Sequence, residues 1–155
     1  LWRLKKWKKK NRPLPMNLLN KDDFWQFACD LYSKGDMQTR LLDYQNQQGK
    51  NVNLCLLLYY LDSLKLAVSQ TQLNKLEQSI CEFDQQVLKP LRATRAYLKA
   101  NQTEIADYAV IRKELLSTEL KLEKQQQQML VEKVNTLTLE PDSRTTNVML
   151  YVGEL

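Results

Sequence analysis

The sequence contains no histidine, and this absence excludes several familiar kinds of catalytic and metal-binding site. Ser–His–Asp triads, HExxH zinc sites and Glu-x-x-His di-iron sites all need an imidazole. Only three glycines and four prolines occur in 155 residues, whereas tight β-hairpins and phosphate-binding loops need glycines at defined positions. The composition therefore disfavours β-rich and nucleotide-binding architectures and favours one helical domain.

The chain also has few cysteines, and none of them stands in a close pair. Cys29, Cys55 and Cys81 are odd in number and widely spaced, whereas a zinc site takes four ligands in close pairs and a secreted scaffold takes an even count. We therefore expect three reduced, buried thiols in a cytoplasmic protein, with no metal and no cofactor.

The net charge of +5 comes from one end of the chain. Seven of the 23 basic residues precede Pro13 without any acid among them: Arg3, Lys5, Lys6, Lys8, Lys9, Lys10 and Arg12. Such a segment suits an anionic membrane surface or nucleic acid, but Met16 directly precedes the first predicted helix. The sequence thus leaves open whether the basic tail 1–15 is native. We expect a helical domain over 16–135 and a C-terminal tail over 136–155 that is partly ordered or disordered.

Cap and stop residues predict a tight pair of helices at the start of the domain. Asn20 or Asp22 caps the first helix, whose apolar residues recur at helical spacing until Gly35. Asp36 then caps a shorter helix that ends at Gly49. Two helices in such a short stretch indicate a helical hairpin.

An apolar segment after Gly49 predicts the centre of the fold. From Leu54 to Leu61 apolar residues cover every face of a helix that begins at Asn51 or Asn53, and such a helix needs neighbours on all sides. The run is far shorter than the roughly 20 residues that cross a bilayer. We expect an all-α, compact bundle of five to six helices around a buried central helix at about 51–67.

Two later stretches are helical but leave their geometry open. Ser69 or Thr71 caps a helical pattern that continues through Pro90 to Ala100, either as one kinked helix or as two helices that break near Lys89. A long final helix follows, and its heptad-spaced apolar residues indicate either a two-helix seam or, preferably, a stripe that faces the bundle. These residues are Tyr108, Leu115, Leu122 and Met129.

Four segments in order resemble a proteobacterial family of conserved hypothetical proteins, a domain of unknown function. They are FWQFACDLY (Phe24–Tyr32), LDYQ (Leu42–Gln45), GKNVNLCLLL (Gly49–Leu58) and VLKPLRATRAYLK (Val87–Lys99). The family pattern runs FW…LY, LQ…G-x-x-VNLLL, PLR…R…LK; this chain departs from it at Cys55 and at Tyr59-Tyr60, where a Trp is expected. The resemblance implies a small helical protein and supplies no activity, cofactor or catalytic residue.

The candidate binding residues are few. Lys89, Arg92, Arg95 and Lys99 share one helix face, which either is solvated and paired with acids such as Asp30, Glu82 or Asp84, or binds an anionic partner. Gln45 and Asn53 are polar residues in apolar surroundings, and Asn53 is expected to cap the central helix or bond the preceding loop. Phe24 and Trp25 are expected in the core rather than in a ligand pocket.

No constellation of paired carboxylates, activated nucleophile or metal ligands is apparent, so we do not expect an enzyme. The leading interpretation is a non-catalytic cytoplasmic module that binds another protein through the basic face and the long final helix. One alternative is an RNA- or ribosome-associated accessory protein that uses the same face. A second is a small-molecule binder or enzyme around Phe24, Trp25, Gln45 and Asn53. The sequence leaves the oligomeric state open.

Overall fold

A computed structural model describes residues 18–143 and 146–153, so the predicted basic tail 1–15 lies outside the described residues. The chain folds as an all-α domain, as predicted. Its α-helices are α2 (Lys21–Tyr32), α3 (Met37–Gln48), α4 (Val52–Ser63), α5 (Gln70–Phe83), α6 (Lys89–Ala100), α7 (Tyr108–Val134) and α8 (Asn147–Val152). Two short strands, β1 (Leu66–Ala67) and β2 (Glu140–Pro141), pair antiparallel.

Helix α2 begins at the predicted cap Asn20 and α3 ends at the predicted Gly49, but α2 already ends at Tyr32, before the predicted stop Gly35, and Asp36 precedes α3 without a side-chain capping hydrogen bond. The Asn20 side chain accepts hydrogen bonds from the N–H groups of Asp22 and Asp23, and these two acids favour the positive end of the helix dipole. Gly49 ends α3 with a φ of 65°. A residue with a Cβ would be strained in this left-handed conformation, so glycine is the natural stop.

Helix α4 lies at the centre of the molecule and packs against α2, α3, α7 and α8. Its cap is Asn51, whose side chain accepts from the Leu54 N–H. Six consecutive residues from Asn53 to Leu58 are buried. The helix ends at Ser63 rather than near 67, because Lys65 takes a φ of 57° and Leu66 then pairs with β2.

Helices α5 and α6 form one long rod through a π-helical turn at Asp84–Leu88. Pro90 has no N–H, and its ring would clash with the carbonyl four residues earlier in a regular helix. A wider π turn just before the proline relieves this clash without breaking the rod. The structure thus fits the single-helix possibility that the sequence left open rather than two helices that break near Lys89.

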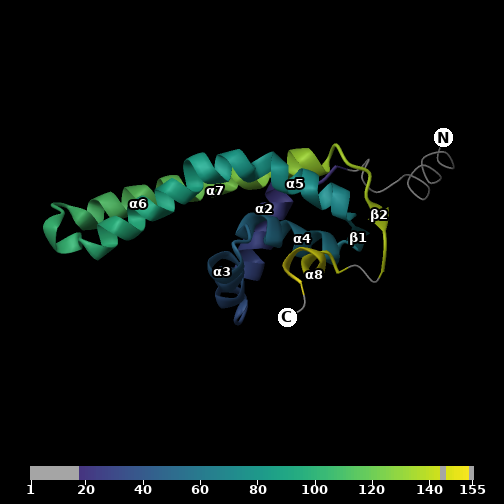
Figure 1. Cartoon of the computed structure of the whole chain (residues 1–155), viewed down its shortest axis with the longest axis horizontal. Helices are drawn as coiled ribbons and strands as arrows, with labels where there is room; N and C mark the ends of the chain where they lie inside the picture. The colour runs from purple at the N-terminus through teal and green to yellow at the C-terminus, as the bar shows by residue number, and fades with distance from the viewer. Residues whose placement is uncertain (1–17, 144–145, 154–155) are drawn as a thin grey trace.

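Helix α7, 27 residues long, packs against both α5 and α6. Figure 1 shows α6 and the first part of α7 extending well beyond α2, α3 and α4. The four heptad-spaced residues of α7 are half-buried. The long final helix therefore belongs partly to the core and partly to a two-helix projection.

The C-terminal residues are held against the end of α4 by hydrogen bonds of Asn147. Its side-chain Nδ2 donates to the Leu66 backbone carbonyl at 2.6 Å, and its side-chain Oδ1 accepts from the Val68 N–H at 2.9 Å. The Asn147 backbone N–H donates to Asp62 at 2.7 Å. Helix α8 is thus tied to the end of α4, and the described part of the predicted tail 136–155 contains β2 and α8.

Candidate functional site

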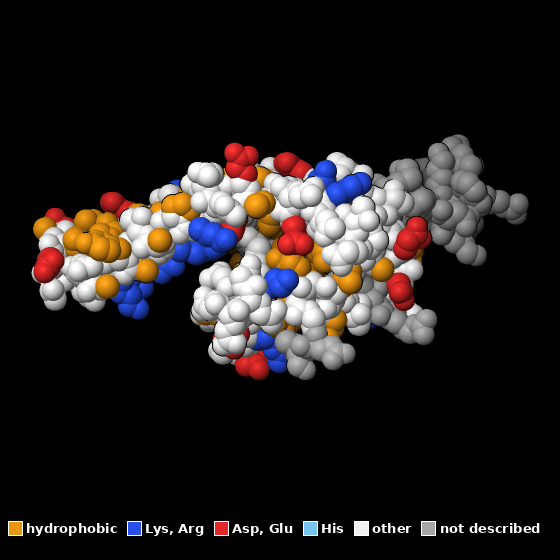
Figure 2. All heavy atoms as spheres, in the orientation of Figure 1, with side chains coloured by type: hydrophobic (Ala, Val, Ile, Leu, Met, Phe, Trp, Pro, Cys, Tyr) orange, Lys and Arg blue, Asp and Glu red, His pale blue; other side chains and the backbone are white. Residues whose placement is uncertain are grey.

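The projection formed by residues 89–118, called the arm from here on, has no buried residue. It consists of α6, the connection 101–107 and the first part of α7, and it is bounded by the buried residues Leu88 and Glu119. Hydrophobic side chains gather near its free end in Figure 2. Tyr97 is 67% exposed and Val110 is 57% exposed. The arm therefore offers apolar surface that the fold itself does not use.

Two predicted basic residues anchor the base of the arm. Arg95 donates through Nε and Nη2 to the two carboxylate oxygens of Glu119, at 2.7 and 3.0 Å. Arg92 donates to Glu123 at 2.7 Å, and its other terminal nitrogen lies 3.8 Å from Asp84. The hydrogen bond to Glu119 raises the pKa of the Arg95 guanidinium, which stays charged.

The other two basic residues are more exposed. Lys89 Nζ lies 3.9 Å from Asp84, and Lys99 lies exposed in the last turn of α6. Of the acids considered as partners from the sequence, Asp84 takes part. Glu119 and Glu123 were missed, although their spacing of four places them on one face of α7 opposite arginines spaced by three. Anion binding by the four residues stays a prediction.

A buried polar network continues from the base of the arm into the body, the name used here for the described residues outside the arm. The Asn53 side-chain Nδ2 donates to Gln126 Oε1 at 2.9 Å and to Glu123. Gln127 Nε2 donates to the Asn53 side-chain Oδ1 at 3.0 Å. The prediction that Asn53 caps α4 is wrong, because Asn51 occupies the cap and Asn53 lies within the helix. Its hydrogen bonds instead fix the position of α7 on α4.

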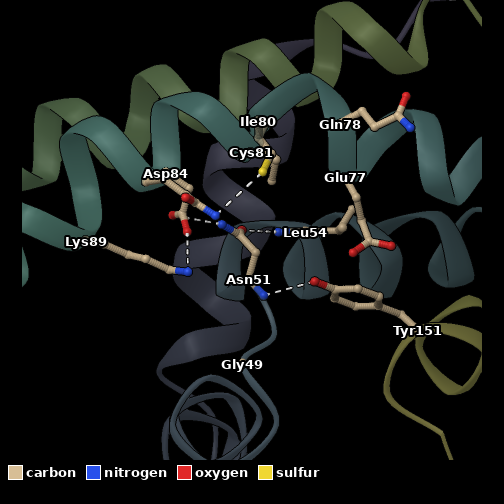
Figure 3. A pocket seen from close by; sticks show the side chains of 11 residues that line it. Gly49, Asn51, Leu54, Glu77, Gln78, Ile80, Cys81, Asp84, Lys89 and Tyr151 are labelled. Atoms are coloured by element: carbon tan, nitrogen blue, oxygen red, sulfur yellow. Dashed lines mark hydrogen bonds and ion pairs between the residues drawn. The ribbon is translucent and has the colours of Figure 1, made fainter.

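On one side of the network lies a cavity of about 250 Å³ (Figure 3). Asn51 stands at its centre: its side-chain amide donates to Asp84 at 3.1 Å, and its backbone N–H donates to the Tyr151 hydroxyl at 3.0 Å. Burial raises the pKa of Tyr151 above the usual range of a tyrosine. The hydrogen bonds of Asn51 along this cavity thus connect α8 to the base of the arm.

On the other side lies a larger cleft of about 440 Å³, where five helices meet. Four of the predicted site residues line it together: Gln45, Asn53, Arg92 and Arg95. Trp25 also lines the cleft. In contrast, Phe24 is fully buried in the core, where it stacks on Tyr60 with ring centroids 5.6 Å apart. The expected core role is confirmed for Phe24, whereas Trp25 is only half-buried.

The cysteines differ from one another. Cys55 is buried in α4, and burial raises the pKa of its thiol to about 12. Cys29 and Cys81 are exposed, so the prediction of three buried thiols is wrong for these two. Both were expected to be buried because free cysteine is among the most buried residue types, but each lies exposed on its helix and lines a cavity.

Within residues 18–143 and 146–153, Cys, Asp and Glu side chains form no group that could hold a metal ion. In the same part of the chain, every helix is too short or too polar to cross a bilayer.

Comparison with known proteins gives a family but no activity. Neither the curated proteins nor the solved structures contain a match. Residues 23–130 match a family described as "Protein of unknown function (DUF2390)". The matched part begins in α2 and ends in α7, so it includes the central helix, the arm and the cleft. The resemblance to a domain of unknown function is thereby confirmed, whereas its proteobacterial origin stays a prediction, and the chain belongs to this family of proteins of unknown function.

Proposed function

We propose that the chain is a non-catalytic accessory protein whose arm binds another protein. The observation that carries this proposal is the arm itself, thirty consecutive residues (89–118) that are helical or turn and without a buried side chain. Isolated helices of this length are marginal in water, and here the base is held by the pairs Arg92–Glu123 and Arg95–Glu119. An anchored hairpin with an unused apolar end is a surface suited to a partner.

The chemistry of the arm indicates the kind of partner. Tyr97 and Val110 supply apolar contact area, and an exposed tyrosine is a common anchor of protein interfaces. Exposed cations (Lys99, Arg112 and Lys113) and exposed acids (Glu104, Asp107 and Glu114) lie on the same projection and suit opposite charges around an apolar centre. We therefore expect a partner protein that presents an apolar patch with charged residues of both signs at its rim.

An RNA partner that uses Lys89, Arg92, Arg95 and Lys99 has less support. Two of these four cations already donate to Glu123 and Glu119, so few remain to neutralise phosphates. Filter binding with RNA at two salt concentrations separates the two ideas. A steep loss of affinity with salt would favour RNA, because it reports released counterions.

The cytoplasmic setting is part of the proposal. Its support is that the three cysteines are all free, which fits a reducing compartment.

Site-specific photocrosslinking tests the role of the arm. Benzoylphenylalanine in place of Ala109, an exposed arm residue, should trap one defined partner in cells. The same group in place of Lys75, exposed on α5, is the matched control and should not. Equal adducts from both positions, or none from position 109, would overturn the proposal. An adduct with the mass of two chains would replace it with self-association.

A further inference from the structure

The cleft beside the base of the arm has the dimensions of a small-molecule site. Its volume of about 440 Å³ lies within the range of roughly 300–1,000 Å³ that is typical of ligand pockets. It lies where α2, α3, α4, α6 and α7 meet, so several helices fix its shape. The arm's exposed end, which carries the proposed function, does not line it.

One wall of the cleft is apolar and aromatic. Trp25 and Tyr32 of α2 line it together with Leu42, Val52 and Leu56 from the next two helices. Lys124 lies 5.1 Å from the centre of the Trp25 ring, and it lines a neighbouring pocket rather than this cleft. Such a wall favours a flat, largely aromatic ligand, because rings stack on it and leave water.

The opposite wall is ionic but electrically balanced. Arg92 and Arg95 face it together with Glu123 and Glu119, and each arginine already donates to a carboxylate at 2.7 Å. An ion that entered would lose its hydration without finding a free countercharge. The cleft is therefore suited to an uncharged ligand.

One buried acceptor in the lining lacks a partner. Gln127 is 4% exposed, and its amide nitrogen donates to Asn53 at 3.0 Å. Its Oε1 atom is buried and has no hydrogen-bond partner among the described residues. Leaving such a group unpaired costs about 1–3 kcal/mol. Since this atom is closed to solvent, Gln127 belongs to the fixed wall of the cleft rather than to the groups that a ligand would contact.

We propose that this cleft binds an uncharged, largely aromatic small molecule. The apolar wall holds the ring system, and the balanced ion pairs exclude charged compounds. This inference is independent of the proposed role of the arm, since either can fail alone.

The test uses N-phenyl-1-naphthylamine, an uncharged aromatic amine that fluoresces in apolar surroundings. The full chain should bind one probe in a saturable titration. Its sulfonated counterpart, 8-anilinonaphthalene-1-sulfonate, should bind at least about tenfold more weakly because its charge must be desolvated.

Two cysteine variants locate the probe. Cys29→Trp fills the cleft from an exposed position on α2 and should weaken binding at least tenfold. Cys81→Trp makes the same change at the other cavity and should leave the affinity unchanged. Tyr97→Ser with Val110→Ser, at the end of the arm, should also leave it unchanged.

Two outcomes of these titrations would overturn the inference. Parent-like binding by Cys29→Trp would place the probe elsewhere. If that variant lost its cooperative melting transition, Leu120→Trp, exposed on the opposite wall, would decide in its place. Tighter binding of the sulfonate would mean that Arg92 and Arg95 accept an anion and that the ligand class is wrong.

Discussion

Two helices of equal length show how differently the body and the arm are built. Helix α4 and helix α6 have 12 residues each, yet seven residues of α4 are buried and none of α6. Each fully buried leucine contributes about 1.5–3 kcal/mol, so the stability of the fold resides in the body. Substitutions of exposed arm residues should therefore cost little folding stability, so the surface of the arm can be adapted to a partner.

The largest contrast should appear when an acid is introduced into each region. Leu57→Asp buries an unpaired charge at a fully buried position and should cost about 3–5 kcal/mol. Val110→Asp in the arm should change stability by less than about 0.5 kcal/mol. Urea unfolding followed by circular dichroism measures both. A Leu57→Asp variant with the parent's melting temperature would refute the central position of α4.

A smaller contrast concerns two ion pairs. Glu119 is 8% exposed and holds Arg95 at the base of the arm, so Glu119→Gln should cost about 1–2 kcal/mol. The exposed pair Arg40–Asp36 is the control, and Asp36→Asn should cost clearly less than Glu119→Gln because solvent screens the pair. Urea unfolding of both variants gives these values. Equal effects would show that the base is not held by its ion pair.

Alkaline pH should weaken the body through Cys55. Burial raises the pKa of this thiol from 9.0 to about 12, so the unfolded chain loses its proton first as pH rises. The stabilising contribution is complete below pH 9 and is lost between 9 and 12. From pH 9 to 10 the free energy of unfolding should fall by about 1 kcal/mol from this group.

The control for this pH effect is the exposed thiol. Cys55→Ala should have a shallower alkaline slope than the parent, whereas Cys81→Ala should keep the parent's slope. The comparison uses slopes, because Cys55→Ala also loses packing. Identical slopes in all three proteins would exclude the buried thiol as a cause.

The smallest effect is expected at the contact of α8 with the cap of α4. Tyr151→Phe removes the hydroxyl that accepts from the Asn51 N–H and should cost about 0.5–1 kcal/mol at pH 7. Thermal unfolding measures it. A larger loss, with changed amide exchange in α6, would mean that α8 also controls the arm.

Local signals in the sequence predicted the helices well. Asn20, Asn51 and Ser69 are caps in the structure, and Gly49 ends α3 because its left-handed conformation suits glycine. These features depend on neighbours within four residues, so they can be recognised without knowledge of the fold. The buried face of α4 was equally clear, because only a surrounded helix is apolar on every side.

The candidate site could be predicted only in part. Arg92 and Arg95 were identified as one face, but their partners Glu119 and Glu123 depend on the register of α7 against α6, which the connection 101–107 sets. The arm was not foreseen either. Apolar spacing along α7 looks the same whether the stripe faces a core or a single neighbouring helix.

The most direct test of the account is the double arm variant Tyr97→Ser with Val110→Ser, measured for melting temperature and for crosslinking through position 109. If the arm serves a partner and the body supplies stability, the melting temperature should stay within about 2 °C of the parent's, while the partner adduct disappears. A fall of more than about 5 °C with the adduct retained would contradict it.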